Sequence, residues 1–224
     1  MSASPPPVAH PAATVVLLRD GRQPCEVLLV QRSARLKFHG GAWVFPGGRL
    51  DAEDYVGAPD LVAAARRAAV REAREEVGLT IRSEPLVLMS RWVTPVQLPK
   101  RFDTWFFAAP GDDASVAIDG GEIHDHRWMS PSEALAAHCS GALALPPPTF
   151  VTLSRLAPYA DAGAALAGLQ AAEVGLFEPR LFPVEGGAVS LYGGDAGYDS
   201  GELERPGPRH RLWILESGWR YDRG

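Results

Sequence analysis

The segment Arg71–Leu79 (REAREEVGL) places three carboxylates on a single helical turn. Glu72, Glu75 and Glu76 stand at positions i, i+3 and i+4, whose side chains lie about 5–6 Å apart on a helix surface. Repulsion between like charges at these spacings costs about 0.2–0.5 kcal/mol per pair, so the cluster works against helix stability. A divalent cation reverses that effect, because Mg²⁺ and Mn²⁺ prefer oxygen ligands. A solvated helix face is the alternative interpretation.

The residues around this segment predict one long helix from Leu61 to Val77. Alanine, the strongest helix former, recurs through it. Pro59-Asp60 supplies a start, and Gly78 stands where a left-handed C-terminal cap belongs. Upstream, Phe45–Gly48 (FPGG) follows an apolar run and predicts a turn after a strand.

A strand, a Gly-Gly turn, a helix with a carboxylate face and a Gly stop together resemble the Nudix box. This box is the signature of the Nudix hydrolases, and the REAREEVGL half fits it at every position. The resemblance implies an α/β/α sandwich with a mixed sheet, and an enzyme that cleaves diphosphate linkages with Mg²⁺ or Mn²⁺.

The same resemblance implies roles for the box residues. Glu72 and Glu76 would be direct metal ligands, and Glu75 would hold a further ion or a metal-bound water, which makes it a catalytic candidate. The carbonyl of Gly47 would add a ligand from the turn. Arg71, the second catalytic candidate, would orient a loop carboxylate rather than touch the substrate.

The first half of the box departs from the common pattern. Six positions after Gly48 stands Asp54, where the family has Glu, but Arg71 then follows seventeen positions later rather than eight. The loop is therefore lengthened. Asp51, Glu53 and Asp54 all remain candidates for the acid that pairs with Arg71.

A second pattern, Leu28–Gly48, resembles the motif of the Nudix coenzyme A diphosphatases. Its spacing fits throughout, with Val30 in place of Thr and Lys37 in place of the second Arg. Lys keeps the charge but loses the bidentate fork of Arg. Arg32, Arg35 and Lys37 form a basic patch suited to substrate phosphates outside the scissile bond. A basic loop that merely frames the site is the alternative.

Later segments resemble the branch that contains the peroxisomal coenzyme A diphosphatase of vertebrates, which also carries a lengthened loop. These segments are Trp92–Pro95, Lys100–Phe107 and Leu145–Thr149. The implied reaction cleaves coenzyme A or acyl-coenzyme A to 3′,5′-ADP and a 4′-phosphopantetheine product. The alternatives are another nucleoside diphosphate substrate, such as ADP-ribose, NADH or a dinucleoside polyphosphate, or a Nudix-fold binding module without catalysis.

The general base is open, because Nudix enzymes place it variously on the box or on a later loop. Glu122 and Asp125 are candidates beside Glu75, and surface acids before an edge strand are the alternative for both. His124 and His126 share one strand face, which suggests a metal. Two His without a third ligand are more often structural.

Composition limits the remaining classes. A net charge of −5 and an isoelectric point near 5.7 argue against nucleic-acid or membrane-surface partners. A small nucleoside diphosphate is the expected partner, and the oligomeric state, a homodimer included, stays open. The N-terminus has no secretory signal, no apolar run reaches a membrane span, and the last four residues are no peroxisomal address, so the cytoplasm is expected.

The expected organisation has three parts: a disordered tail over 1–12, a Nudix domain over 13–160, and a helical plus β-hairpin extension over 161–224 packed on that domain. Strands are predicted at 13–19, 25–32, 86–93, 103–109 and 126–129. Further helices are predicted at 130–138, where Ser130 and Glu133 form a capping box, at 149–159 and at 162–173. The terminal hairpin pairs 211–216 with 219–221.

Overall fold

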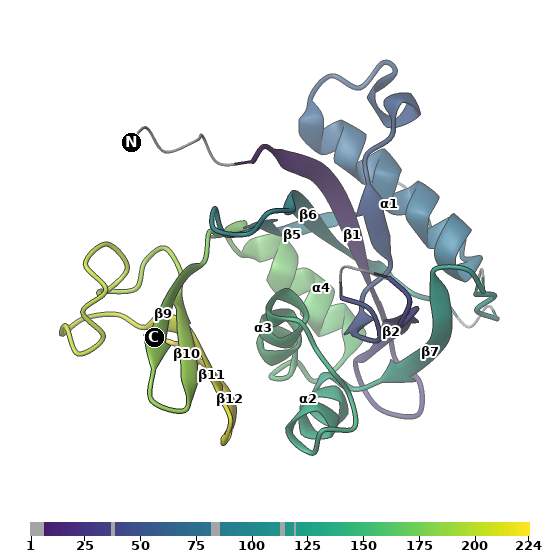
Figure 1. Ribbon diagram of the computed structural model, residues 1–224. Coiled ribbons are helices and arrows are strands. Elements are labelled where there is room, and N and C mark those ends of the chain that lie inside the picture. The colour runs from purple at the N-terminus through teal and green to yellow at the C-terminus, as the bar shows by residue number, and fades with distance from the viewer. Residues whose placement is uncertain (1–6, 37–38, 82–85, 113–114, 119) are drawn as a thin grey trace. The chain divides into compact units, whose positions relative to one another are not determined.

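The computed structural model describes residues 7–36, 39–81, 86–112, 115–118 and 120–224 (Figure 1). The chain divides into two compact units. The larger unit comprises Pro11–Ser90 and Thr104–Gly175. The smaller unit comprises Arg91–Asp103 and Leu176–Gly224, together with Pro7–His10.

The helices and strands follow the predicted order closely. The strands are β1 Ala9–Arg19, β2 Glu26–Arg32, β3 Trp43–Val44, β4 Gly47–Arg49, β5 Val87–Val93, β6 Arg101–Pro110, β7 Ile123–Met129, β8 Gly175–Phe177, β9 Arg180–Val184, β10 Gly187–Leu191, β11 His210–Leu215 and β12 Gly218–Arg223. The helices are the 3₁₀ turn η1 Ala52–Tyr55, α1 Leu61–Val77, α2 Pro131–Cys139, α3 Pro147–Leu156 and α4 Ala162–Ala171.

A sheet with the strand order β3-β2-β1-β6-β5-β8 forms the centre of the fold, and β4 and β7 pair with β1 and β2 respectively. Figure 1 shows α1 on one side of this sheet and α3 and α4 on the other, which confirms the predicted sandwich. Helix α1 buries alanines against the sheet, so its backbone approaches the strands closely. The core here includes Ala65, Ala69, Leu17, Leu28 and Phe107, each fully buried.

Helix α1 begins and ends where the sequence predicts. Asp60 accepts a hydrogen bond from the amide of Ala63 at 2.8 Å, which satisfies one of the free N–H groups of the first turn. Gly78 adopts a left-handed conformation with φ 68°, and its amide donates to the last turn. The helix that presents the carboxylates therefore has fixed ends.

The capping box of Ser130 and Glu133 is confirmed, and the first two predicted strands pair as an antiparallel hairpin, β1–β2. Several boundaries were predicted wrongly; β7, for example, begins at Ile123 rather than at residue 126. Strand β1 begins at Ala9, inside the expected tail. Helix α3 begins at Pro147 rather than Thr149, because proline has the right φ for a first turn and lacks only an N–H that would be unsatisfied there.

The division of the chain also differs from the expected boundary at residue 161. Helix α4 belongs to the larger unit, where the Asp20 carboxylate of the β1–β2 turn accepts the amide of Ala162 at 2.9 Å. The Arg91–Asp103 segment groups instead with the C-terminal residues, because Trp92 stacks on Phe177 with ring centroids 4.0 Å apart.

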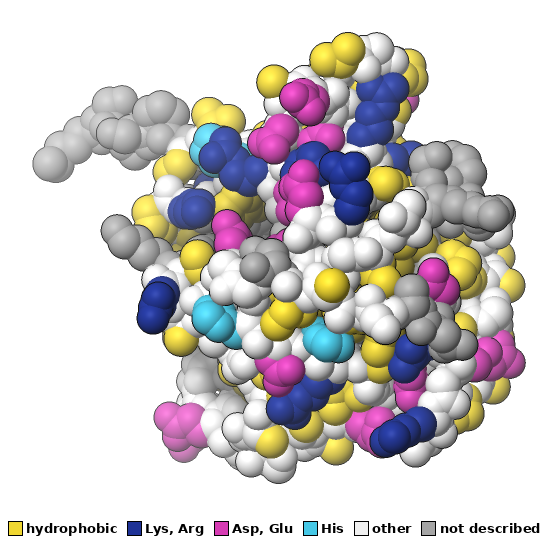
Figure 2. Space-filling model, turned by 90° about the vertical axis from the view of Figure 1, so that its right-hand side faces the viewer, with side chains coloured by type: hydrophobic (Ala, Val, Ile, Leu, Met, Phe, Trp, Pro, Cys, Tyr) yellow, Lys and Arg dark blue, Asp and Glu magenta, His cyan; other side chains and the backbone are white. Residues whose placement is uncertain are grey.

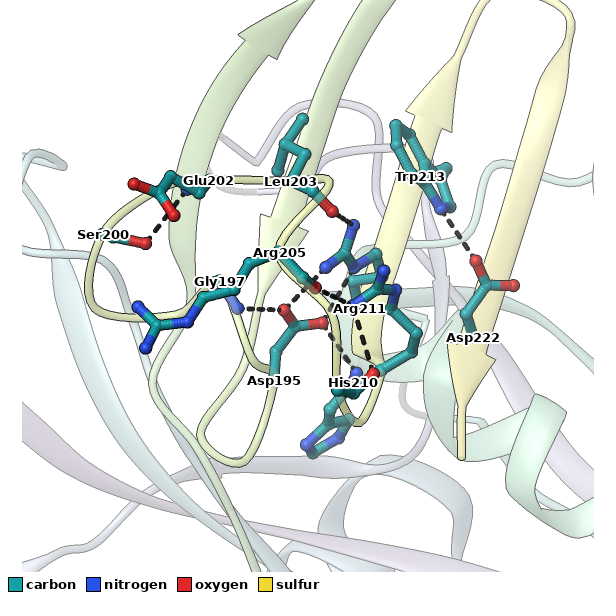
Figure 3. A network of polar contacts seen from close by, with 12 residues as sticks. Asp195, Gly197, Ser200, Glu202, Leu203, Arg205, His210, Arg211, Trp213 and Asp222 are labelled. Atoms are coloured by element: carbon teal, nitrogen blue, oxygen red, sulfur yellow. Dashed lines mark hydrogen bonds and ion pairs between the residues drawn. The ribbon is translucent and has the colours of Figure 1, made fainter.

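The smaller unit contains an antiparallel sheet in the order β12-β11-β10-β9, and the predicted terminal hairpin is confirmed as β11–β12. A fully buried ion pair organises the loop between β10 and β11 (Figure 3). Arg211 donates to both carboxylate oxygens of Asp195, at 2.8 and 2.7 Å, and to the carbonyl of Leu203 at 2.9 Å. Asp195 also accepts the amides of Gly197 and His210.

Within the described part of the chain, no helix combines the length and the apolar character that a membrane span requires.

Candidate active site

The carboxylate turn of α1 faces the FPGG segment, Phe45–Gly48. The turn predicted here is only a bend at Pro46, because Gly47 and Gly48 already belong to strand β4, which pairs with β1. The amide of Gly47 donates to Glu76 Oε2 at 2.8 Å. A side chain at Gly48 would overlap the carboxylate of Glu72, and one at Gly47 would overlap the carbonyl oxygen of Ala13 on β1. Close approach to backbone therefore requires glycine at position 47, whereas Gly48 lies against the movable end of the Glu72 side chain. The FPGG segment thus lies directly against two of the three predicted metal ligands.

Arg71 pairs with Asp54, which answers the question that the lengthened loop left open. Its Nη2 donates to Asp54 Oδ2 at 3.0 Å and to the carbonyl of Arg49 at 2.9 Å, and its Nε reaches Asp54 Oδ1 at 3.4 Å. Asp54 is buried, with 4% of its surface exposed, whereas Asp51 is exposed and lies farther from Arg71, at 3.6 Å. Glu53 is exposed.

Arg71 also contacts the carboxylate cluster itself. Its Nη1 donates to Glu72 at 2.9 Å and to Glu75 at 3.0 Å. Burial opposes the charge of Arg71, but hydrogen bonds to Asp54 and to the two glutamates outweigh it, and the pKa of the guanidinium is raised. Arg71 is thus a permanent cation between the loop and the carboxylate turn.

Glu76 is the most buried of the three glutamates, with 6% of its surface exposed. Burial raises its pKa to about 8, which the hydrogen bond from Gly47 only partly offsets. The charge of Glu72 raises the pKa further, and the charges of Arg32 and Glu122 act on it in opposite directions. Within the described residues Glu76 makes no ion pair, so its charge lacks a direct counterion.

The oxygen atoms at this site are ligands of the type that a divalent cation prefers. Glu72 and Glu76 supply hard oxygen ligands, and a cation would neutralise the buried charge of Glu76. Glu75 turns to Arg71 instead, and among the described residues no three His, Cys, Asp or Glu side chains converge as a finished cation site. Bound Mg²⁺ or Mn²⁺ would act as a Lewis acid and lower the pKa of a bound water.

Strand pairing brings Glu122 close to this cluster. Arg32, at the end of β2, pairs with Ile123 on β7, and Ser33 donates its amide to the carbonyl of Glu122 at 2.7 Å. Arg32 Nη2 lies 3.5 Å from a carboxylate oxygen of Glu122. Both side chains act on the pKa of Glu76, so Glu122 lies nearer the carboxylate turn than its sequence position alone would indicate.

The other residues predicted for the site fall into three groups. Arg35 is exposed, and Lys37 lies outside the described residues. Asp125 pairs at 3.5 Å with the exposed Arg127 of its own strand. His124 and His126 both lie on β7, and their role stays a prediction. Figure 2 shows acidic and basic side chains side by side near the top of the view, at the height of α1 in Figure 1.

The raised pKa of Glu76 predicts how pH changes the stability of the metal-free protein. The carboxyl should ionise near its usual pH of 4.5 in the unfolded chain and only near 8 in the folded protein, so raising the pH between these values favours unfolding. Gln cannot ionise, so the free energy of unfolding of Glu76→Gln should rise relative to that of the wild type by a few kcal/mol as the pH increases through this window. Above about pH 8 the difference should stay constant. Urea unfolding in a chelator at about pH 5, 7 and 9 measures the difference. A difference independent of pH would contradict the raised pKa.

The fold and the site define the class of protein. Residues 8–144 match the NUDIX domain, and the chain belongs to the Nudix family. Among solved structures it resembles a NUDIX hydrolase from Alicyclobacillus acidocaldarius, with a TM-score of 0.67 and 26% identity over 71% of this chain and 96% of that one.

Three individual Nudix proteins are similar to this chain in sequence. Over 60% of this chain's length, the sequence is 28% identical to nudix hydrolase 7 of Caenorhabditis elegans. Over 34% of this chain's length, it is 42% identical to the peroxisomal coenzyme A diphosphatase ndx-8 of the same organism. It is 35% identical to the human acyl-coenzyme A diphosphatase NUDT19 over 51% of its length. These matches span 57%, 30% and 33% of the relatives' own lengths.

Proposed function

We propose that this protein is a metal-dependent diphosphatase that cleaves coenzyme A or its thioesters. The observation that carries the proposal is that Glu72 and Glu76 lie against the FPGG segment, which ends a pattern with the spacing of the coenzyme A diphosphatase motif. The partial similarity to two coenzyme A diphosphatases supports the same substrate class.

In the proposed reaction, the oxygen of a water attacks one phosphorus of the diphosphate and the bridging P–O bond breaks. The water loses a proton, and the bridging oxygen leaves with the other phosphate. Coenzyme A then yields 3′,5′-ADP and 4′-phosphopantetheine. Mg²⁺ or Mn²⁺ is the proposed cofactor, held by Glu72, Glu76 and the carbonyl of Gly47.

The chain's own residues divide the remaining work. Arg71 holds the carboxylate turn against the loop through Asp54. Glu122 or Glu75 accepts the proton of the attacking water; Glu122 is 61% exposed at its side chain and Glu75 49%, so either can meet a solvent-accessible water. Arg32, Arg35 and Lys37 bind the phosphates that do not react in this proposal, which rests on their spacing before the FPGG segment.

If the basic patch of Arg32, Arg35 and Lys37 binds the 3′-phosphate of coenzyme A, its removal should affect substrates with and without that phosphate differently. Lys37→Ala should lower kcat/KM for coenzyme A about ten- to a hundredfold more than for 3′-dephospho-coenzyme A, because a charge-assisted hydrogen bond is worth roughly 1.5–3 kcal/mol. Steady-state kinetics on both substrates measures the ratio, with Arg22→Ala, an exposed cation elsewhere on the chain, as the control. The scissile diphosphate is the same in both substrates, so the ratio separates the patch from the metal site.

Equal losses on the two substrates would mean that Lys37 only supports its loop. Hydrolysis of another nucleoside diphosphate derivative, such as ADP-ribose, NADH or a dinucleoside polyphosphate, would then become the better proposal. A binding module without catalysis is disfavoured, because such a module has no need of three carboxylates that repel one another on one turn.

A further inference from the structure

The lengthened loop between β4 and α1 is fastened to α1 by two arginines one helical turn apart. Arg67 and Arg71 stand at i and i+4, so their side chains leave the same face of the helix. Arg71 binds the carboxylate of Asp54, as described above. The Arg67 side chain contacts the same loop, but its partners are backbone carbonyl groups of the loop.

Arg67 is directed at the carbonyl groups that follow the turn η1. Its Nη1 donates to the carbonyl of Val56 and approaches that of Asp54 at 3.5 Å, and its Nη2 lies 3.4 Å from the carbonyl of Gly57. Unpaired carbonyls at the end of a helical turn carry partial negative charge, which a guanidinium neutralises. Gly57 has φ 65°, so the chain reverses there in a conformation that suits glycine.

Asp54 interacts with both arginines. Its carboxylate accepts the amide of Asp51 at 2.8 Å within a capping box and also binds Arg71. Its carbonyl faces Arg67. Asp54 is buried, so a shift of the η1 backbone would move a carboxylate that has little room to compensate.

We propose that Arg67 is a positioning residue for the metal site. By fixing the backbone of η1 it holds Asp54 in place, Asp54 holds Arg71, and Arg71 holds the carboxylate of Glu72. The lengthened loop then helps to position the carboxylates of α1. The inference rests on the proposed function in one respect, namely that Glu72 serves a bound cation.

The test compares Arg67→Ala with Arg67→Lys and with Arg74→Ala. Arg74 is an exposed cation on the same helix whose side chain makes no hydrogen bond or ion pair within the described residues, so it controls for lost charge. Arg67→Ala should weaken Mn²⁺ binding and lower kcat about three- to tenfold, with KM for the diphosphate nearly unchanged. Arg67→Lys should recover part of the loss. Mn²⁺ affinity is measured by electron paramagnetic resonance without substrate, and thermal melting confirms folding.

A double-mutant cycle with Asp54→Ala tests the route. If Arg67 acts through Asp54, then Arg67→Ala should weaken Mn²⁺ binding much less in the Asp54→Ala background than in the wild type. Additive losses, or equal Mn²⁺ affinities for Arg67→Ala and Arg74→Ala, would overturn the proposed role while leaving the function intact. A wild type that binds no Mn²⁺ would instead overturn the metal site, and the role of Arg67 with it.

Discussion

Glu72→Gln and Glu76→Gln should each reduce turnover at saturating Mg²⁺ by more than the roughly 10- to 100-fold that loss of an outer-shell partner costs at metal sites. Both carboxylates face the FPGG segment, and Gln keeps the shape of the side chain but removes the charge that a cation needs. Steady-state kinetics at rising Mg²⁺ concentrations measures the loss.

The two variants should fold as well as the wild type. Removing a carboxylate from a repelling turn relieves the helix, and the Gln oxygen at position 76 can still accept the amide of Gly47. Glu173→Gln, at an exposed position after α4, is the matched control. Near wild-type rates in both site variants would contradict the assignment of the metal ligands, whereas unfolding of either would show a structural role instead.

Arg211→Met should destabilise the protein by about 3–5 kcal/mol, the typical cost of leaving one member of a buried ion pair without its partner. The Asp195 side chain is fully buried, and Arg211 supplies two of its hydrogen bonds (Figure 3). The loop between β10 and β11 would lose its central contact. Urea unfolding measures the change in free energy.

The chain offers a matched comparison for this effect. Arg180 pairs with Asp199 at 3.4 Å, but both side chains are exposed, at 47% and 91%. Arg180→Met should therefore cost no more than about 1 kcal/mol. Similar losses in Arg180→Met and Arg211→Met would contradict the claim that burial of the Asp195 pair dominates.

Local signals were enough to predict α1 and the cap of α2. Asp60, Gly78 and the Ser130–Glu133 box each act within one helical turn, so neighbouring residues in the sequence determine them. The site was predictable where it depends on the same turn, as Glu72, Glu75 and Glu76 do. The metal roles of these residues stay predictions.

Contacts between distant segments could not be predicted in the same way. Choosing Asp54 over Asp51 as the partner of Arg71 depends on the path of a lengthened loop, which spacing alone does not define. The approach of Glu122 to Glu76 depends on the register of β7 against β2. Arg67 gave one signal, its position one turn before Arg71, but its loop partners are backbone carbonyls that no sequence pattern reveals.

The division into two units has the same origin. Trp92 is buried, and its stacking partner Phe177 is distant in sequence. The predicted boundary at residue 161 was placed near the end of the family resemblance, whereas α4 groups with the larger unit. The contact of Asp20 with Ala162 joins α4 to the first hairpin and could be found only from the structure.

The central claim is tested most directly by incubating the protein with coenzyme A and Mg²⁺ or Mn²⁺ and identifying the products by chromatography and ³¹P resonance. A parallel set contains ADP-ribose, NADH and a dinucleoside polyphosphate, and Glu76→Gln and a chelator serve as controls. We expect 3′,5′-ADP and 4′-phosphopantetheine in equal amounts, formed only with the wild type and metal. Intact coenzyme A beside rapid cleavage of another diphosphate would contradict the proposed substrate, and no cleavage of any diphosphate would contradict the proposed activity.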